Sequence, residues 1–370
     1  MTTMTDVARA IGVSIQTVSA VINDKPGISE ATRGRVQRAI SELDYHPNGL
    51  ASSLRSQRSL TVGVLVPSIT NPYWPGIVRG AEDVAHRNGY SILLCNTDGD
   101  PAKHLAYIRL LRRQRVAGLF SMSGDGGREE WKIVEQLVAN GVPVALGGGD
   151  RPGERIITFD VDDRRGGYTA AAHLLELGHR RVGVISGPAG AAVTTDRIAG
   201  YQDALSERFL PFDAELIVPG GFNVAAGQAG ANDLMRLPSP PTAIVAANDL
   251  CAIGAITALK RLGKRIPQDV AIVGFDDIEM AALYDPALTT VAQPLYDMGA
   301  YAMQAILDRL HTPDLGGEHT VFDTQLVVRR STVATSGRHD EEPRPGAAPR
   351  NRTPRAGAGR QPVLRKEEPI

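Results

Sequence analysis

From residue 60 to about residue 286, short apolar runs alternate with longer amphipathic segments, and this alternation restricts the possible folds more than any other feature of the chain. The apolar runs include "LTVGVLVP", "SILLCNT", "AGLFSMS" and "VAIVGFDD", and amphipathic segments such as "DLCAIGAITALKRLG" separate them. Strands buried on both faces read as continuous apolar runs, and parallel neighbours are connected through helices. The pattern therefore predicts an α/β fold of doubly wound parallel sheets with helices on both faces.

The alternation breaks near "RIITFDVDDRRGG", which indicates two α/β lobes rather than one. We expect the first lobe to comprise residues about 60–160 and 291–322, and the second about 161–290 and 323–336, so that later segments cross back to complete both lobes. Small molecules bind at the carboxyl ends of the strands in open parallel sheets. A cleft between the lobes is therefore the expected place for a ligand.

Ahead of the lobes, residues 1–45 are predicted to form an all-α unit. Thr3 and Asp6 have the spacing of a capping box, Gly12 ends the first helix, and Ser14 can cap the second. Ser29 can cap a third helix after the loop that contains "DKPG". Three short helices with a tight turn between the first two form the helix-turn-helix layout, whose second helix enters the major groove of DNA.

Two further segments lack the apolar pattern of a core. Residues 46–59, "HPNGLASSLRSQRS", contain too few apolar residues for a stable isolated helix, so they form either a plain linker or a hinge that orders on meeting a partner. Residues 337–370 are rich in Pro, Arg, Gly and Ala, with eight basic and five acidic residues. This composition predicts a disordered, basic and proline-rich tail.

The charge and cysteine content favour a protein of the cytoplasm. The formal net charge is −1, so attraction to a polyanion must come from local patches rather than from the field of the whole chain. Cys95 and Cys251 lie in or beside apolar runs, which is typical of buried free thiols in a reducing compartment. The N-terminal "MTTMTDVARA" lacks the apolar core of a signal peptide, and no stretch reaches the roughly 20 apolar residues of a membrane span.

The sequence does not favour an enzyme. The glycine-rich "SGDGGREE" does not match the spacing of a phosphate-binding loop. The eight histidines and two cysteines show no metal-ligand spacing. No nucleophile–base arrangement is suggested by sequence position. We therefore expect a non-enzymatic protein without a cofactor or metal.

The run "TMTDVARAIGVSIQTVSAVIN" and the later "YHPNGLASSLRS" closely resemble the DNA-binding headpiece of the lactose-repressor/galactose-repressor (LacI/GalR) family of bacterial transcription regulators. The stretches "VGVLVPSITNPYW", "DRIAGY" and "PTAIVAANDLCAIGAI" are similar to the family's periplasmic-binding-protein-like core. The resemblance covers residues 3 to about 333. It implies an allosteric repressor that binds a near-palindromic operator as a homodimer and is located at the nucleoid when bound to DNA.

The resemblance also implies a small polar effector in the cleft, most simply a sugar or a sugar derivative from carbohydrate metabolism. Whether that effector releases DNA or promotes binding stays open. A second class of function also stays open, namely a solute-binding receptor of the periplasmic-binding-protein class without a DNA function. Such a receptor shares the core but has no use for "GVSIQTVSAVIN".

By family position, the base-reading residues are Ile15, Gln16 and Ala20. Gln16 can pair with an adenine edge, while Ile15 and Ala20 can contact thymine methyl groups. Many relatives carry Arg where this chain has Ala20, so one guanine contact is absent here. The residues expected to contact the DNA backbone are Ser14, Thr17, Ser19, Asn23, Ser29 and Thr32. The residues expected to meet the minor groove from the hinge are Asn48, Ala51, Leu54 and Arg55.

The resemblance places the effector among six residues, which are Tyr73, Trp74, Arg197, Phe222, Asn248 and Asp276. Aromatic faces together with Arg, Asn and Asp suit a polar, hydroxylated ligand. Two of the six have alternative interpretations, since Trp74 can be a core residue and Asn248 a helix cap. Asp160 and Asp162, near the change of lobe, are weaker candidates. The three glycines of "ALGGGDRP" stand where relatives often place polar side chains near the ligand.

Overall fold

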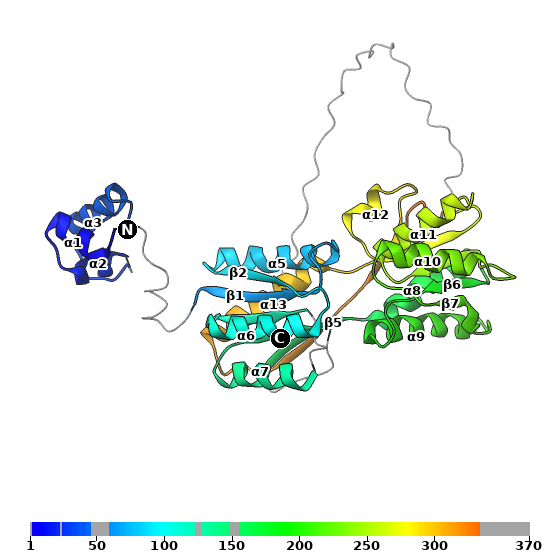
Figure 1. The fold of residues 1–370 in the computed structure, drawn as a ribbon, viewed down its shortest axis with the longest axis horizontal. Coiled ribbons are helices and arrows are strands. Elements are labelled where there is room, and N and C mark those ends of the chain that lie inside the picture. The colour runs from blue at the N-terminus through cyan, green and yellow to red at the C-terminus, as the bar shows by residue number, and fades with distance from the viewer. Residues whose placement is uncertain (1, 23, 46–58, 123–126, 149–154, 334–370) are drawn as a thin grey trace, which may run out of the picture. The chain divides into compact units, whose positions relative to one another are not determined.

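The computed structural model describes residues 2–22, 24–45, 59–122, 127–148 and 155–333 (Figure 1). Nearly all of the expected hinge segment and the whole of the expected tail, residues 337–370, lie outside the described residues. Of the expected DNA-contacting residues, the following also lie outside them: Asn23, Asn48, Ala51, Leu54 and Arg55.

The N-terminal unit consists of three helices, α1 (Met4–Ile11), α2 (Ile15–Ile22) and α3 (Glu30–Glu42). The predicted capping box is present, because Thr3 Oγ1 accepts from the Asp6 N–H at 3.3 Å and Asp6 Oδ2 accepts from the Thr3 N–H at 2.9 Å. Gly12 ends α1 with φ at 65°, a conformation that glycine adopts easily. The core of this unit is a small apolar cluster of Val7, Ala8, Val18, Val21, Val36, Ala39 and Tyr45.

The first lobe is built on a six-stranded parallel sheet in the order β11-β5-β4-β3-β1-β2. Its strands are β1 (Thr61–Val66), β2 (Ser91–Asn96), β3 (Gly118–Ser121), β4 (Val144–Gly147), β5 (Ile156–Val161) and β11 (Glu318–Phe322). Its helices are α5 (Tyr73–Arg87), α6 (Pro101–Arg113), α7 (Gly127–Ala139) and α13 (Leu295–His311). Helices α5 and α13 pack together on one face of the sheet, and α6 and α7 cover the other.

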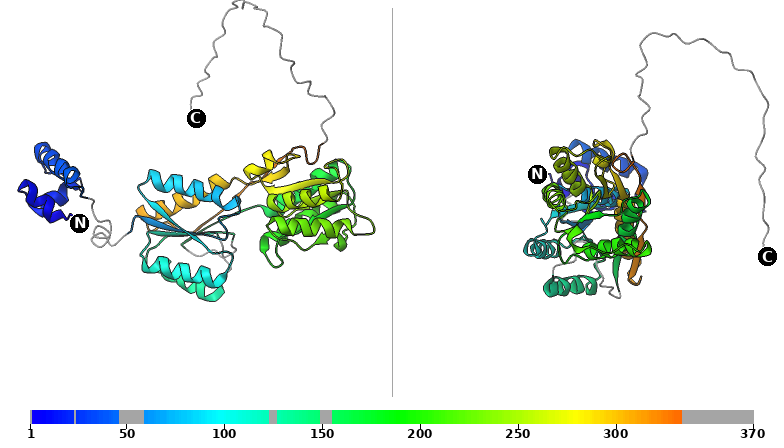
Figure 2. Two further views of the ribbon diagram at one scale, coloured as in Figure 1. Left: turned by 45° about the horizontal axis from the view of Figure 1, so that its top comes forward. Right: turned by 90° about the vertical axis from the view of Figure 1, so that its right-hand side faces the viewer.

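The second lobe repeats this plan with the strand order β12-β10-β9-β8-β6-β7. Its strands are β6 (Val182–Ile185), β7 (Ile217–Val218), β8 (Ala243–Ala246), β9 (Ala271–Asp276), β10 (Thr289–Ala292) and β12 (Gln325–Val327). Its helices are α8 (Asp163–Glu176), α9 (Ala192–Glu207), α10 (Val224–Met235), α11 (Asp249–Arg261), the short α12 (Glu279–Leu283) and the 3-10 turn η1 (Ala214–Leu216). Figure 2 shows helices on both faces of each sheet.

The structure confirms the predicted fold class, an all-α headpiece followed by two doubly wound α/β lobes, with two differences in detail. Strand β12 pairs antiparallel with β10, so the second sheet is not wholly parallel as expected. The strand β10 lies in the second sheet, and α13 of the first lobe begins only at Leu295. The chain therefore returns to the first lobe a few residues later than the expected position at residue 291. None of the described helices is long and apolar enough to cross a membrane.

Three helix pairs pack so closely that only glycine fits at their crossings. A Cβ atom on Gly80 of α5 would overlap the carbonyl oxygen of Tyr296 in α13, and one on Gly299 would overlap that of Ile77. The same reciprocal arrangement joins α8 to α9 and α10 to α11, and its glycines are Gly167, Gly200, Gly227 and Gly254. Because backbone meets backbone at these crossings, each pair leaves little room for relative movement.

Candidate functional site

The first candidate surface is the N-terminal end of α2. Ser14 caps this helix, because its Oγ accepts from the Thr17 N–H at 3.1 Å and lies 2.9 Å from the Thr17 hydroxyl. The side chain of Ile15 is 46 % exposed and Gln16 is exposed as well, whereas Val18 is buried in the core of the unit. An exposed isoleucine on the first turn of a helix offers an apolar contact to a partner.

The remaining described DNA-contact candidates lie near the helix N-termini or on α2. Ser29 caps α3 by accepting from the Thr32 N–H at 3.3 Å, and its hydroxyl donates to Thr32 Oγ1 at 2.9 Å. Ser19 and Ala20 are half-buried on α2. The N–H groups at a helix N-terminus bind phosphate well. Ser14, Ser29 and Thr32 therefore lie at positions suited to contacts with the phosphate backbone of DNA.

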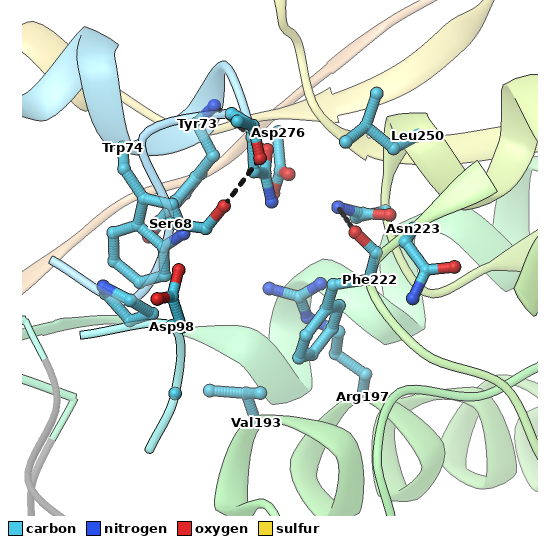
Figure 3. Close-up of a pocket in the computed structure, with 15 residues that line it drawn as sticks. Ser68, Tyr73, Trp74, Asp98, Val193, Arg197, Phe222, Asn223, Leu250 and Asp276 are labelled. Atoms are coloured by element: carbon cyan, nitrogen blue, oxygen red, sulfur yellow. Dashed lines mark hydrogen bonds between the residues drawn. The ribbon is translucent and has the colours of Figure 1, made fainter. Parts of the chain in front are cut away.

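The second candidate site is a cavity of about 390 Å³ whose walls come from both lobes (Figure 3). Its lining includes all six residues expected to bind an effector, which are Tyr73, Trp74, Arg197, Phe222, Asn248 and Asp276. Residues that sequence reasoning did not single out complete the wall, and they include Ser68, Thr70, Asn71, Asp98, Val193, Asn223 and Leu250. Ser68 and Asp98 each come two residues after the end of a strand, β1 and β2 respectively, and this position is the signal that could have identified them.

The topology explains why these side chains meet. Tyr73 and Trp74 form the first turn of α5 after β1, Asn248 caps α11 after β8, and Asp276 is the last residue of β9. Asn248 also acts as a helix cap, because its Oδ1 accepts from the Cys251 N–H at 2.9 Å. Trp74 is also in part a core residue, because it packs against the apolar core of the first lobe. These two residues nevertheless also line the cavity.

Asp276 is almost fully buried and has an unusual backbone φ of 114°. Its Oδ1 accepts from Gln293 Nε2 at 2.8 Å, and Gln293 Oε1 in turn accepts from the Tyr73 hydroxyl at 3.3 Å. Burial raises the pKa of Asp276 well above its usual range, and burial likewise raises the pKa of Tyr73. Sequence reasoning missed Gln293, which occupies the crossover between β10 and α13 and connects Asp276 of the second lobe to Tyr73 of the first.

Arg197 is held from three sides. Its Nε donates to Asp163 Oδ1 at 2.7 Å, its Nη1 donates to the Ala247 carbonyl oxygen at 2.5 Å, and its Cζ lies 3.6 Å from the centre of the Phe275 ring. Cation–π contact and ion pairing together fix the plane of the guanidinium. Asp163, the first residue of α8, was also missed, because its partner on α9 becomes apparent only when the packing of α8 on α9 is known.

The weaker candidates and the glycine run are not part of the lining that the structure describes. Asp162 caps α8 by accepting from the Arg165 N–H at 2.8 Å, and Asp160 lies in β5. Gly147 is close-packed, since a Cβ there would meet the Met122 sulfur at 2.6 Å. Gly149 lies outside the described residues. Over the described ranges, no cluster of His, Cys, Asp and Glu could hold a metal ion.

Comparison with known proteins identifies both parts of the chain. Residues 3–48 match the family described as bacterial regulatory proteins, lacI family, and residues 171–332 match the periplasmic binding protein-like domain. The HTH-type transcriptional regulator DegA of Bacillus subtilis (strain 168) is 36 % identical over 331 residues, which cover 90 % of this chain and 98 % of DegA.

Two solved structures cover a similar extent. The Lac repressor dimer bound to operator and the anti-inducer ONPF superposes with a TM-score of 0.80 at 28 % identity, covering 90 % of this chain and 99 % of that chain. The complex of the transcriptional regulator CelR with cellobiose superposes with a TM-score of 0.67 at 32 % identity, covering 90 % of this chain and 100 % of that chain. These relatives are transcriptional regulators and not enzymes, and a receptor without a DNA function does not fit the N-terminal match. The chain belongs to the LacI family of DNA-binding transcriptional regulators, with a helix-turn-helix unit and an effector-binding domain.

Proposed function

We propose that this regulator is a repressor that binds a near-palindromic operator as a homodimer, and that a small polar effector, a sugar or a sugar derivative, controls its affinity for DNA. The observation that carries the proposal is the cavity, in which all six family-expected effector positions meet from both lobes. A ligand that contacts both lobes can favour one relative arrangement of them over another, which is the requirement for an allosteric switch.

The chemistry of the cavity supports a sugar-like effector. Trp74 and Phe222 present apolar faces on opposite sides, and the guanidinium of Arg197 points in between them (Figure 3). Sugars combine an apolar ring face with many hydroxyl groups, so they suit a cavity that has both aromatic surfaces and convergent polar groups. The relative CelR was solved with cellobiose, which supports the same class of ligand.

The exposed end of α2 supports direct reading of the operator. Ile15 and Gln16 occupy the first turn of the helix that enters the major groove in helix-turn-helix proteins. We assign base reading to these two residues and Ala20. In the hinge segment, we assign minor-groove contacts to Asn48, Ala51, Leu54 and Arg55, with Leu54 as the wedge that kinks the operator.

Exposed apolar side chains support the homodimer. Ile69 is 51 % exposed and, with Val78 and Leu94, lines a groove beside the edge strand β2. Leu283 of α12 is 77 % exposed in the second lobe. Large exposed apolar residues beside an edge strand favour a protein partner, and a two-fold partner would match the symmetry of a palindromic operator. A regulator of chromosomal genes would act in the cytoplasm.

The test compares the full chain with a chain that lacks residues 1–58, using duplex DNA from the region upstream of the gene. The full chain should bind this DNA with a Kd of roughly 10 nM or below, and the shortened chain should lose sequence-specific binding. Neutral sugars added to the full chain should change its DNA affinity. Unchanged binding after the deletion would contradict the assignment of DNA contact to the headpiece.

A further inference from the structure

Arg197 is the only cationic side chain among the described residues that line the cavity. Its Nε lies 2.7 Å from Asp163 Oδ1, and the side chains of Arg197 and Asp163 are only 15 % and 9 % exposed, respectively. A charge-assisted bond of this kind in a nearly buried setting is strong and costly to break. The positive charge of Arg197 is therefore already balanced before any ligand enters.

The other charged side chains that the structure describes at the cavity do not supply a free cation. The lining contains two carboxylates, Asp98 and Asp276. Asp98 forms an ion pair with Lys103, whose Nζ lies 2.5 Å from Asp98 Oδ2. With the Arg197–Asp163 pair, the groups named so far are two cations and three carboxylates. Even with Asp276 protonated, the charges of these described groups only cancel, so they offer an entering anion no unbalanced positive charge.

Arg197 can nevertheless hold a neutral ligand. Two of its nitrogens are engaged, by Asp163 and by the Ala247 carbonyl oxygen, and one face covers the Phe275 ring. The guanidinium has five N–H donors in a fixed fork, so donors remain that point into the cavity (Figure 3). Hydroxyl oxygens can accept from these donors without displacing Asp163.

We propose that Asp163 sets the charge class of the effector: it neutralises Arg197, so that the cavity takes an uncharged, polyhydroxylated ligand and rejects phosphorylated or carboxylated sugars. The inference rests on the proposed function, which makes this cavity the effector site. An anion would have to displace Asp163 from Arg197 or add a negative charge beside Asp163 and Asp276. Either event is unfavourable in a partly desolvated cavity.

The decisive experiment uses inorganic phosphate as the probe and Asp163→Asn as the variant. Asparagine keeps an oxygen that can accept from Arg197 Nε, but it removes the negative charge. We expect Asp163→Asn to bind phosphate at least about tenfold more tightly than the wild type, measured by calorimetry and by phosphate-dependent shifts in melting temperature. The double variant Asp163→Asn/Arg197→Met should return to the wild-type value, because the gain depends on Arg197.

The proposal would be overturned if the wild type bound phosphate and Arg197→Met did not. It would also be overturned if Asp163→Asn bound phosphate no more tightly than the wild type. A second measurement needs only the wild type and compares glucose with glucose 6-phosphate, and ribose with ribose 5-phosphate. Tighter binding of either phosphate ester than of its parent sugar would also contradict the proposal. If no sugar binds, the proposed sugar effector fails, but the phosphate comparison between variants still decides the role of Asp163.

Discussion

Asp249, the first residue of α11, is a carboxylate with no exposed surface, and it makes stability depend on pH. Its Oδ1 accepts from Thr290 Oγ1 at 2.6 Å and its Oδ2 accepts from the Ile278 N–H at 2.9 Å. Burial raises the pKa of Asp249 to about 7, although both hydrogen bonds act in the opposite direction. The unfolded chain has an ordinary Asp pKa of about 4. Between about pH 4 and pH 7, the folded state therefore binds a proton at Asp249 that the unfolded state has lost.

The stabilising effect of this proton is complete below about pH 4 and is lost as the pH rises through about 7. We expect the free energy of unfolding to fall between pH 5 and pH 7.5, with Asp249 contributing at most about 4 kcal/mol. Asp249→Asn mimics the neutral form and should reduce this slope, which urea unfolding at several pH values would measure. Asp314→Asn, at an exposed position, is the control and should keep the wild-type slope. Equal slopes in all three proteins would contradict the role of Asp249.

Ala20 gives the second prediction at this scale, because a longer basic side chain at this position can reach a base edge. Ala20→Arg should shift the preferred half-site toward guanine by about 1–3 kcal/mol, since arginine pairs bidentately with guanine. Selection from a library of randomised half-sites would measure the preference. Ala10→Arg, at an exposed position of α1, adds the same charge and should raise affinity for all sequences alike. An unchanged preference in Ala20→Arg would exclude position 20 from base reading.

Residues that line the cavity were predictable only where the chain resembles a known family. The six expected effector positions were carried over by motif, and all of them line one cavity. Gln293 and Asp163 were missed because their roles depend on contacts across the chain, with Tyr73 220 residues away in one case and Arg197 34 residues away in the other. Periodicity carries no information on such pairs.

At the scale of elements, the reciprocal glycines determine how closely the helices pack. Gly80→Ala should destabilise the first lobe by about 1–3 kcal/mol or more, because its new Cβ would overlap the Tyr296 backbone and α5 would have to move from α13. Gly76→Ala, one turn earlier in the same helix, is the matched control. Its Cβ would meet only the Leu295 side chain at 3.1 Å, and a side chain can yield where a backbone cannot.

Both variants gain about 1 kcal/mol of helix propensity. The difference between their free energies of unfolding therefore reports the effect of the overlap where α5 crosses α13. Chemical denaturation of the two full-length variants would measure this difference in the free energy of unfolding. If Gly76→Ala proved as destabilising as Gly80→Ala, the overlap with the Tyr296 backbone would not be the main cause of the lost stability.

The apolar pattern predicted the buried, regular strands and helices, but it did not predict the elements at the edges of the sheets. The antiparallel strand β12 has only three residues, and its direction depends on where the chain re-enters the second lobe. The run "AELIVPG" gives only the two-residue strand β7, because η1 takes up most of its first half. Short edge elements carry too little apolar pattern for direction or length to be inferred.

At the scale of the whole molecule, the cavity connects the lobes through one chain of hydrogen bonds. Asp276 in the second lobe is bonded to Gln293 at the crossover, and Gln293 is bonded to Tyr73 in the first lobe. A ligand that contacts Asp276 therefore acts on a link that both lobes share. To switch DNA binding, the effector must favour one arrangement of the lobes by a few kcal/mol.

Asp276→Ala tests this coupling. A hydrogen bond contributes about 0.5–1.5 kcal/mol when both groups are neutral and about 1.5–3 kcal/mol when one is charged, so affinity for a neutral sugar should fall roughly tenfold. At a saturating sugar concentration, the wild type should gain about 3 kcal/mol of stability by mass action, and the variant should lose most of the resulting shift in melting temperature. The sugar should also lose its effect on operator affinity.

Asp233→Ala, on the exposed face of α10, is the control and should respond as the wild type does. A sugar-induced shift of equal size in Asp276→Ala and the wild type would remove Asp276 from the effector site.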